Sequence, residues 1–244
     1  MNPDTAPSLQ IDGARATIRL RRPLEHNRID PSDLAILLDH FEQARSNKEV
    51  RVLIVTGTGH KTFSSGYTVA AIREHLDDRL EKVLDTLESL PLPVVCALNG
   101  SVYGGAIDLA LCCDFRIGVK GNRMFMPAAK FGLHYYPGGI RRYVTRLGLS
   151  SAKRLFLTAR VIDAEEMLRI GFLTELVDAD QLEPAVARYV DAIVECEPGV
   201  VASMKLHLNR TADGNIDLAA QRAAYERSLR SDELARRLQV LAKG

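Results

Sequence analysis

Apolar residues in the first two-thirds of the chain occur in two patterns, short continuous runs and longer stretches with helical spacing. A short run that is apolar or nearly so is typical of a strand buried on both faces. Such runs predict strands at residues 50–56, 94–98 and 115–119. Two further strand-like runs, 8–12 and 14–20, surround Asp12-Gly13, a dipeptide that favours a hairpin turn.

Helical spacing separates these runs. Residues 31–45 and 78–90 have the spacing of amphipathic helices, and the second stretch stops before Pro91. A short apolar helix is predicted from Gly104-Gly105 to about residue 111. Strands and helices therefore alternate, as expected for an α/β fold.

The last third of the chain has a different pattern. A loop at residues 126–139 is rich in Pro, Gly and Tyr, and the chain beyond it is predicted to be nearly all helix. Amphipathic helices are predicted at residues 181–195, 198–209, 216–229 and 231–242. We therefore predict a sheet-containing core at residues 1–180 and a helical C-terminal region at residues 181–244. The apolar faces of that region must be buried elsewhere, which predicts packing against neighbouring subunits.

Composition narrows the class of protein. The chain has 244 residues, 46% hydrophobic and 26% charged, with a formal net charge of +1. That charge does not favour nucleic-acid binding through a broad basic surface, so no nucleic-acid partner is expected. No stretch approaches the roughly 18 apolar residues of a membrane span, and the N-terminus lacks a signal-peptide pattern. These features predict a cytoplasmic protein with no membrane partner.

Motifs for several common chemistries are absent. The four cysteines form no CxxC pair and are expected to be small buried hydrophobes, and the six histidines lack metal-ligand spacing. Gly57-Thr58-Gly59 begins like a dinucleotide-binding turn, but Thr62 occupies the position of its third glycine. Phosphate-loop and serine-hydrolase motifs are also missing.

Two glycine-containing turns follow predicted strands and are the candidate site. They are residues 62–67 (TFSSGY) and residues 99–108 (NGSVYGGAID). Small residues let backbone N–H groups approach a ligand closely, and two such groups could form an oxyanion hole for an enolate. The same pattern also fits two tight strand-to-helix turns that bind nothing.

Four segments in succession carry a family resemblance. VLIVTGTGHKTFSSGYTVAAI, PLPVVCALNGSVYGGAIDLALCCDFRIG, FGLHYYPGGIRRYVTRLG and RVIDAEEMLRIGFLTELVD resemble the crotonase (enoyl-CoA hydratase/isomerase) superfamily. The resemblance implies a spiral of ββα units with a helical C-terminal trimerisation region, and a homotrimer or hexamer. It implies an acyl-CoA or acyl-carrier-protein thioester as substrate, a role such as fatty acid metabolism, and no cofactor beyond the coenzyme A of the substrate.

Carried over by position, the resemblance assigns the oxyanion donors to the backbone N–H groups of Tyr67 and Gly105. The same turns would bind the substrate through Ser65, Gly66 and Gly104. The family wraps the coenzyme A nucleotide at the position of RRPLEHN, so backbone near Leu24 and His26 is a candidate contact. A turn without a ligand is the alternative for that segment.

The acid–base residues of the family are only partly present. Its first carboxylate follows the glycine pair by three residues and corresponds to Asp108, which could instead only complement the positive end of a helix. Its second acid follows Pro127, where this chain has Ala128. Alanine cannot transfer a proton, so hydration by two acids is disfavoured.

A tyrosine in the next loop favours a different reaction. Tyr135 in GLHYYPGGI resembles a tyrosine that serves the substrate in methylmalonyl-CoA decarboxylase-like members, although those have His-Asp at the positions of Tyr67-Thr68. The best prediction is therefore decarboxylation of a malonyl-type acyl thioester. The alternatives are an enoyl-CoA hydratase or isomerase with Asp108 as sole acid–base residue, and a catalytically inactive binding subunit.

Overall fold

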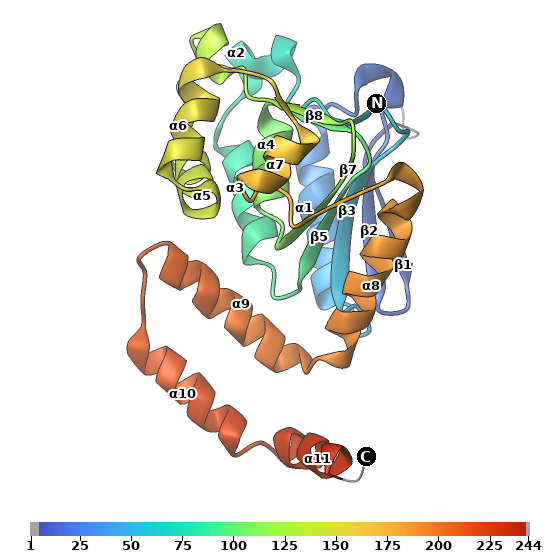
Figure 1. Cartoon of the computed structure of the whole chain (residues 1–244), viewed down its shortest axis with the longest axis vertical. Coiled ribbons are helices and arrows are strands. Elements are labelled where there is room, and N and C mark those ends of the chain that lie inside the picture. The colour runs from blue at the N-terminus through green and yellow to red at the C-terminus, as the bar shows by residue number, and fades with distance from the viewer. Residues whose placement is uncertain (1–4, 243–244) are drawn as a thin grey trace.

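A six-stranded sheet forms the centre of the molecule (Figure 1). The computed structural model describes residues 5–242 of the chain. The sheet order is β1 (Ser8–Asp12), β2 (Arg15–Leu20), β3 (Val52–Gly57), β5 (Val94–Leu98), β7 (Phe115–Val119) and β10 (Glu175–Val177). The hairpin β1–β2 is antiparallel and the remaining pairs are parallel. The five strands predicted from the apolar runs are confirmed.

A second, smaller sheet lies beside the first and was not predicted. Its order is β4 (Thr62–Ser64), β6 (Ser101–Tyr103), β8 (Arg123–Phe125) and β9 (Ile162–Asp163). Each of β3, β5 and β7 is followed by one of these short strands and then by a helix. The chain is therefore an α/β fold of repeated ββα units, as the resemblance implied.

Helices cover both faces of the larger sheet (Figure 1). On one side lie α1 (Asp33–Ser46), α2 (Ile72–His75), α3 (Asp78–Ser89), α4 (Gly105–Leu111), α5 (Pro137–Leu147), α6 (Leu149–Thr158) and α7 (Ala164–Arg169). On the other side α8 (Leu182–Glu195) packs Ala185 and Val186 against strand residues such as Val52 and Val95. Because β3, β5 and β7 are buried on both faces, their residues are mostly apolar, and the exceptions Thr56 and Arg116 are themselves buried.

The last three helices extend away from this body (Figure 1). They are α9 (Pro198–Ala212), α10 (Leu218–Leu229) and α11 (Asp232–Leu241). Lys205 attaches α9 to the sheet, since its Nζ donates to Leu92 O at 2.8 Å and pairs with Asp114 Oδ2 at 2.7 Å. Lys205 is therefore a structural residue of this junction. Large apolar side chains such as Leu218 and Val240 are exposed on these helices.

Beyond residues 126–139 the chain is nearly all helix, as predicted, except for two short strands. That segment itself contains a short 3₁₀ helix, Ala128–Phe131, and β9 and β10 lie further along the chain. These strands have two and three residues and pair with β8 and β7, which are distant in sequence. Strands this short carry no detectable alternation. Cys96, Cys112 and Cys113 are buried as expected, but Cys196 is exposed, which corrects the prediction for that residue.

Within the part of the chain that the structure describes, no helix has the length and apolar composition needed to cross a lipid bilayer.

Candidate functional site

The two glycine-containing turns lie side by side because they leave neighbouring strands. Strands β4 and β6 are parallel, with Thr62 opposite Ser101 and Ser64 opposite Val102. Parallel neighbours end at the same edge of a sheet, so the residues that follow them meet there. The turns at residues 65–67 and 104–105 are those residues, and they come together as the sequence predicted.

Only glycine fits at position 66. Its φ is +82°, and a Cβ built there would lie 2.6 Å from Gly105 N and 2.9 Å from Tyr103 O. A real Cβ does not approach backbone atoms so closely, and a side chain at this φ would also be strained. The missing side chain therefore lets the two turns pack backbone to backbone.

This contact leaves two backbone donors facing one space. Around Tyr67 the neighbouring groups are bonded, since Ile29 N donates to Gly66 O at 2.8 Å and Thr68 N donates to Ile29 O at 3.0 Å. Among residues 5–242, neither the N–H of Tyr67 nor that of Gly105 has a hydrogen-bond acceptor. A Cβ on Gly105 would lie 3.6 Å from Tyr67 N, so the two amides border the same gap. Two such donors are the requirement for an oxyanion hole.

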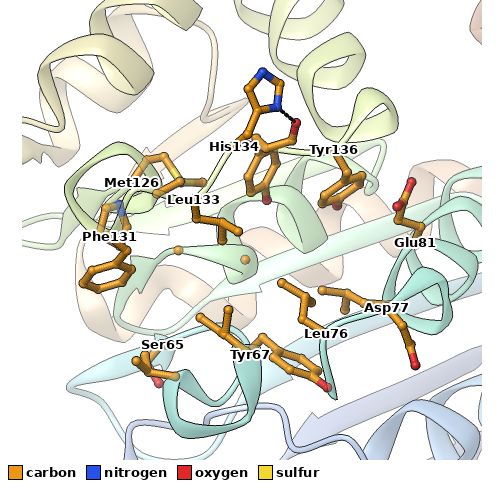
Figure 2. Close-up of a pocket in the computed structure, with 18 of the residues that line it drawn as sticks. Ser65, Tyr67, Leu76, Asp77, Glu81, Met126, Phe131, Leu133, His134 and Tyr136 are labelled. Carbon is orange, nitrogen blue, oxygen red and sulfur yellow. Dashed lines mark hydrogen bonds between the residues drawn. The ribbon is translucent and has the colours of Figure 1, made fainter. Parts of the chain in front are cut away.

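A cavity of about 310 Å³ opens on these donors (Figure 2). Its apolar lining comes from Val69, Ile72, Leu76, Leu80, Met126, Pro127, Ala128, Phe131 and Leu133. Its polar lining comes from Ser65, Tyr67, Asp77, Asp78, Glu81, Gly104, Gly105, His134, Tyr135 and Tyr136. A mostly apolar cavity with a few polar groups is typical of a small-molecule site.

The Tyr67 side chain supports the wall of the cavity. Its hydroxyl donates to His75 O at 2.7 Å, at the end of α2, and the residue is buried. Burial, followed by the charge of Asp77, raises the pKa of this hydroxyl above its usual value. It therefore stays protonated and holds α2 in place, while the backbone N–H faces the cavity.

Asp108 is withdrawn from the cavity. Its side chain is 0% exposed and forms an ion pair with the equally buried Arg142, with Nε donating to Oδ1 at 2.8 Å. The Tyr136 hydroxyl donates to the other oxygen, Oδ2. Asp108 does not line the cavity, and both of its oxygens are already hydrogen-bonded. A carboxylate paired in this way is poorly placed to exchange protons with a ligand.

The ion pair belongs to a larger network between α3 and α5. Arg142 Nη1 also donates to Asp85 Oδ1 at 2.8 Å and to Glu88 Oε2 at 3.1 Å. Glu88 accepts further bonds from Arg141 and, at 3.0 Å, from Arg146. Burial alone would raise the pKa of Glu88, but the arginine side chains outweigh it and lower that pKa. The arginines thus keep Glu88 charged, and the network joins α3, α4 and α5 behind the cavity.

The two adjacent tyrosines have different environments. The Tyr135 ring packs against Tyr136, Tyr143 and Phe156, with ring centroids 4.7, 6.0 and 5.1 Å apart. Its hydroxyl is buried with no hydrogen-bond partner among the described residues, and burial followed by Asp108 raises its pKa well above the usual value. Tyr136 lines the same cavity but bonds Asp108. The catalytic role of Tyr135 stays a prediction.

The remaining predicted residues divide between two places. Ser65, Gly66 and Gly104 form the paired turns, where Ser65 N donates to His26 O at 2.8 Å. Leu24 is 96% exposed on the surface, and the His26 ring bonds Thr62 at 2.9 Å. Neither Leu24 nor His26 lines the cavity. Their proposed contact with the coenzyme A nucleotide stays a prediction.

Glu81 on α3 is a cavity residue that the sequence reasoning missed (Figure 2). It is half-buried, and it has no hydrogen-bond or ion-pair partner within residues 5–242. Burial, followed by the charge of Asp85, raises its pKa above the usual glutamate value. Glu81, Asp85 and Glu88 recur at helical spacing beside the apolar face of α3, and that pattern was the available signal.

Comparisons with known proteins show the family of this chain. Residues 10–236 match the family model described as enoyl-CoA hydratase/isomerase. The chain is 30% identical to a crotonyl-CoA hydratase of Syntrophomonas wolfei over 86% of its length and 84% of that protein. It is also 30% identical to a short-chain-enoyl-CoA hydratase of Clostridium acetobutylicum over the same shares, and to a carnitinyl-CoA dehydratase of Salmonella paratyphi A over 81% and 77%.

Solved structures show the same fold. The chain superposes on an enoyl-CoA hydratase from Bacillus anthracis with a TM-score of 0.87, at 24% identity and over 97% of this chain and 96% of that one. An enoyl-CoA hydratase from Shewanella pealeana gives a TM-score of 0.87 at 24% identity, over 99% of this chain and 94% of that one.

The burial of Asp108 generates a stability prediction. Asp108→Asn removes one of the three carboxylates paired with the fully buried Arg142 guanidinium, which we expect to lower the free energy of unfolding by about 3 kcal/mol. Asp213→Asn is the control, because it removes a partly exposed carboxylate from Arg141 at the rim of the network and should cost less than about 1 kcal/mol. Urea denaturation measures both changes. Equal stability of Asp108→Asn and wild type would contradict the buried ion pair.

Proposed function

Because this chain belongs to the enoyl-CoA hydratase/isomerase family, we propose that it adds water reversibly to a short 2-enoyl-CoA thioester. The observation that carries the proposal is the pair of acceptor-free N–H groups, those of Tyr67 and Gly105, facing one mostly apolar cavity. The substrate carbonyl oxygen would accept from both. The names of the relatives, crotonyl-CoA hydratase and short-chain-enoyl-CoA hydratase, support an enoyl thioester as the substrate class.

The chemistry of hydration requires this oxyanion hole. When a water oxygen bonds to the β-carbon, electrons of the double bond move to the thioester oxygen and form an enolate. Donors aimed at that oxygen stabilise the charge as it develops, and each is worth roughly 10²–10³ in turnover. The route needs the coenzyme A carried by the substrate and no further cofactor. An acyl-carrier protein could present the same thioester.

Decarboxylation of a malonyl-type thioester is the second candidate. Loss of carbon dioxide also leaves an enolate, so the same donors would serve. The buried Ala128 favours this reaction, because no carboxylate at that position repels the carboxylate of the substrate. Glu81 counts against it, because an ionised Glu81 in the same cavity would repel that group. Isomerisation of the double bond needs one acid–base group and is an outcome of the same assays.

We also propose that the chain forms a homotrimer or hexamer through its C-terminal helices. Helices α10 and α11 contain no residue described as buried, and they expose Leu218, Leu229 and Val240. An amphipathic helix without a covered apolar face is unstable in water, so another surface must cover it. A second copy of this chain is the partner we propose.

Gly105→Ala tests the oxyanion hole. The new methyl would stand 3.6 Å from Tyr67 N, an ordinary contact that the fold tolerates, but it enters the gap that the substrate oxygen needs. We expect turnover to fall roughly 10²–10³-fold, with thermal stability unchanged or slightly higher because alanine favours a helix. Steady-state kinetics and thermal unfolding measure the two effects. Full activity in a folded Gly105→Ala variant would show that the substrate oxygen does not bind in this gap.

A paired assay separates the two reactions. Wild type is expected to hydrate crotonyl-CoA and to release no carbon dioxide from malonyl-CoA or methylmalonyl-CoA. Gly105→Ala is the control, since it should suppress whichever activity belongs to this cavity. Release of carbon dioxide without hydration would show that the chain is a decarboxylase and would overturn the proposed hydration. A chain that binds the thioesters and converts none of them would be an inactive binding subunit.

The oligomer is tested by light scattering on the full chain at micromolar concentration. We expect the mass of a trimer or hexamer. Leu218→Glu combined with Val240→Glu should shift that mass toward the monomer, because each change places a charge in the proposed interface. A stable wild-type monomer would contradict the proposal.

A further inference from the structure

Two carboxylates of the cavity, Asp78 and Glu81, have no hydrogen-bond or ion-pair partner within residues 5–242, and of the two only Glu81 is half-buried. Glu81 projects from α3 on the same side of the cavity as Tyr136, away from Ser65 and Phe131 (Figure 2). It is half-buried and has no hydrogen-bond or ion-pair partner in the described part of the chain. The network behind it pairs both Asp85 and Glu88 with arginines, yet leaves Glu81 out.

The other acidic groups near the cavity are unsuited to proton transfer. Asp108 is buried behind Tyr136 with both oxygens bonded. Asp77 accepts from the Arg79 backbone N–H and pairs with the Arg79 side chain, and Figure 2 shows it directed away from the cavity. Asp78 is exposed to solvent. At the position of the family's second acid stands Ala128.

We propose that Glu81 is the catalytic acid–base group of this cavity and replaces the carboxylate that the family places at the position of Ala128. The inference rests on the proposed hydration and deepens it, because it names the group that moves the proton. Glu81 lines the same cavity of about 310 Å³ as Tyr67 and Gly105, so a short acyl chain held on their amides would share that cavity with its carboxylate.

The surroundings of Glu81 suit a proton-transfer group. Asp78 and Asp85 on α3 and Asp108 on α4 act on it with negative charge, and Arg142 on α5 acts on it with positive charge. Burial and then Asp85 have the larger effects, so the pKa of Glu81 is raised above the usual glutamate value. A base with a pKa nearer the working pH returns its proton more readily. Burial followed by Asp108 raises the pKa of Tyr136, which therefore stays a hydrogen-bond donor and is no competing base.

One carboxylate can carry both proton transfers. Glu81 takes a proton from water while the water oxygen bonds to the β-carbon and the double-bond electrons move to the thioester oxygen. The Tyr67 and Gly105 amides hold that oxygen. The protonated Glu81 then gives its proton to the α-carbon as the enolate electrons return. One water is added across the double bond, and the carboxylate is restored.

The test compares Glu81→Gln with Glu74→Gln. Gln keeps the shape of the side chain and removes its proton-transfer ability. Glu74 on α2 is exposed and does not line the cavity, so its variant makes the same charge change at a distance from the site. We expect Glu81→Gln to lower kcat for crotonyl-CoA hydration at least about 10²-fold with little change in KM or thermal stability, and Glu74→Gln to leave kcat near wild type.

The pH profile gives a readout that a structural role would not produce. Because Glu81 must be ionised to accept a proton, wild-type kcat/KM should fall as pH drops through its raised pKa. Glu81→Gln should lose this acid limb. Glu81→Asp, which keeps the charge but withdraws it by one methylene, should keep the limb and lose roughly tenfold or more in kcat.

The outcomes distinguish the role of Glu81 from the proposed hydration itself. If wild type hydrates crotonyl-CoA and Glu81→Gln stays within about threefold of it, Glu81 is not the acid–base group and the proposed hydration stands. The same conclusion follows if the acid limb persists in Glu81→Gln. If wild type hydrates no enoyl thioester, the proposed function fails, and the role of Glu81 fails with it.

Discussion

The site depends on the backbone contact between residue 66 and residues 105–106. A Cβ at Gly66 would lie within 2.9 Å of two backbone nitrogens, so the turns can meet only if position 66 has no side chain. The contact requires β4 and β6 to be parallel neighbours, and it places two acceptor-free amides around one gap. The fold positions the donors with main-chain atoms, which leaves the side chains of the cavity free to set the reaction.

Charge is distributed unevenly around that gap. Behind it, Arg142 joins Asp85, Glu88 and Asp108 into a buried network in which positive and negative groups compensate one another. Such a network contributes little net stability but is costly to break, because each lost partner leaves a buried charge. On the cavity side, Glu81 is half-buried and has no counter-ion within residues 5–242.

The C-terminal helices, in contrast, carry large apolar side chains that are exposed. Helix α9 is attached through the Lys205–Asp114 pair and through Arg141 and Asp213. Helices α10 and α11 have few contacts with the body, and Figure 1 shows them extending from it. Their exposed apolar side chains therefore lie outside the sheet core, which is complete without them.

The sequence by itself determined the local structure and the family. Nearly all-apolar runs located β3, β5 and β7 within about two residues, because a strand buried on both faces admits few polar side chains. Glycines marked the paired turns, because only glycine adopts the required backbone there. The three-residue strands β4 and β8 are too short to carry a period and were missed. Only the tertiary structure decided which carboxylate meets the cavity. Asp108 and Arg142 are 34 residues apart, and Glu81 comes from a helix that precedes both. Whether an acid is paired or free depends on neighbours brought together by folding, and no local pattern records them.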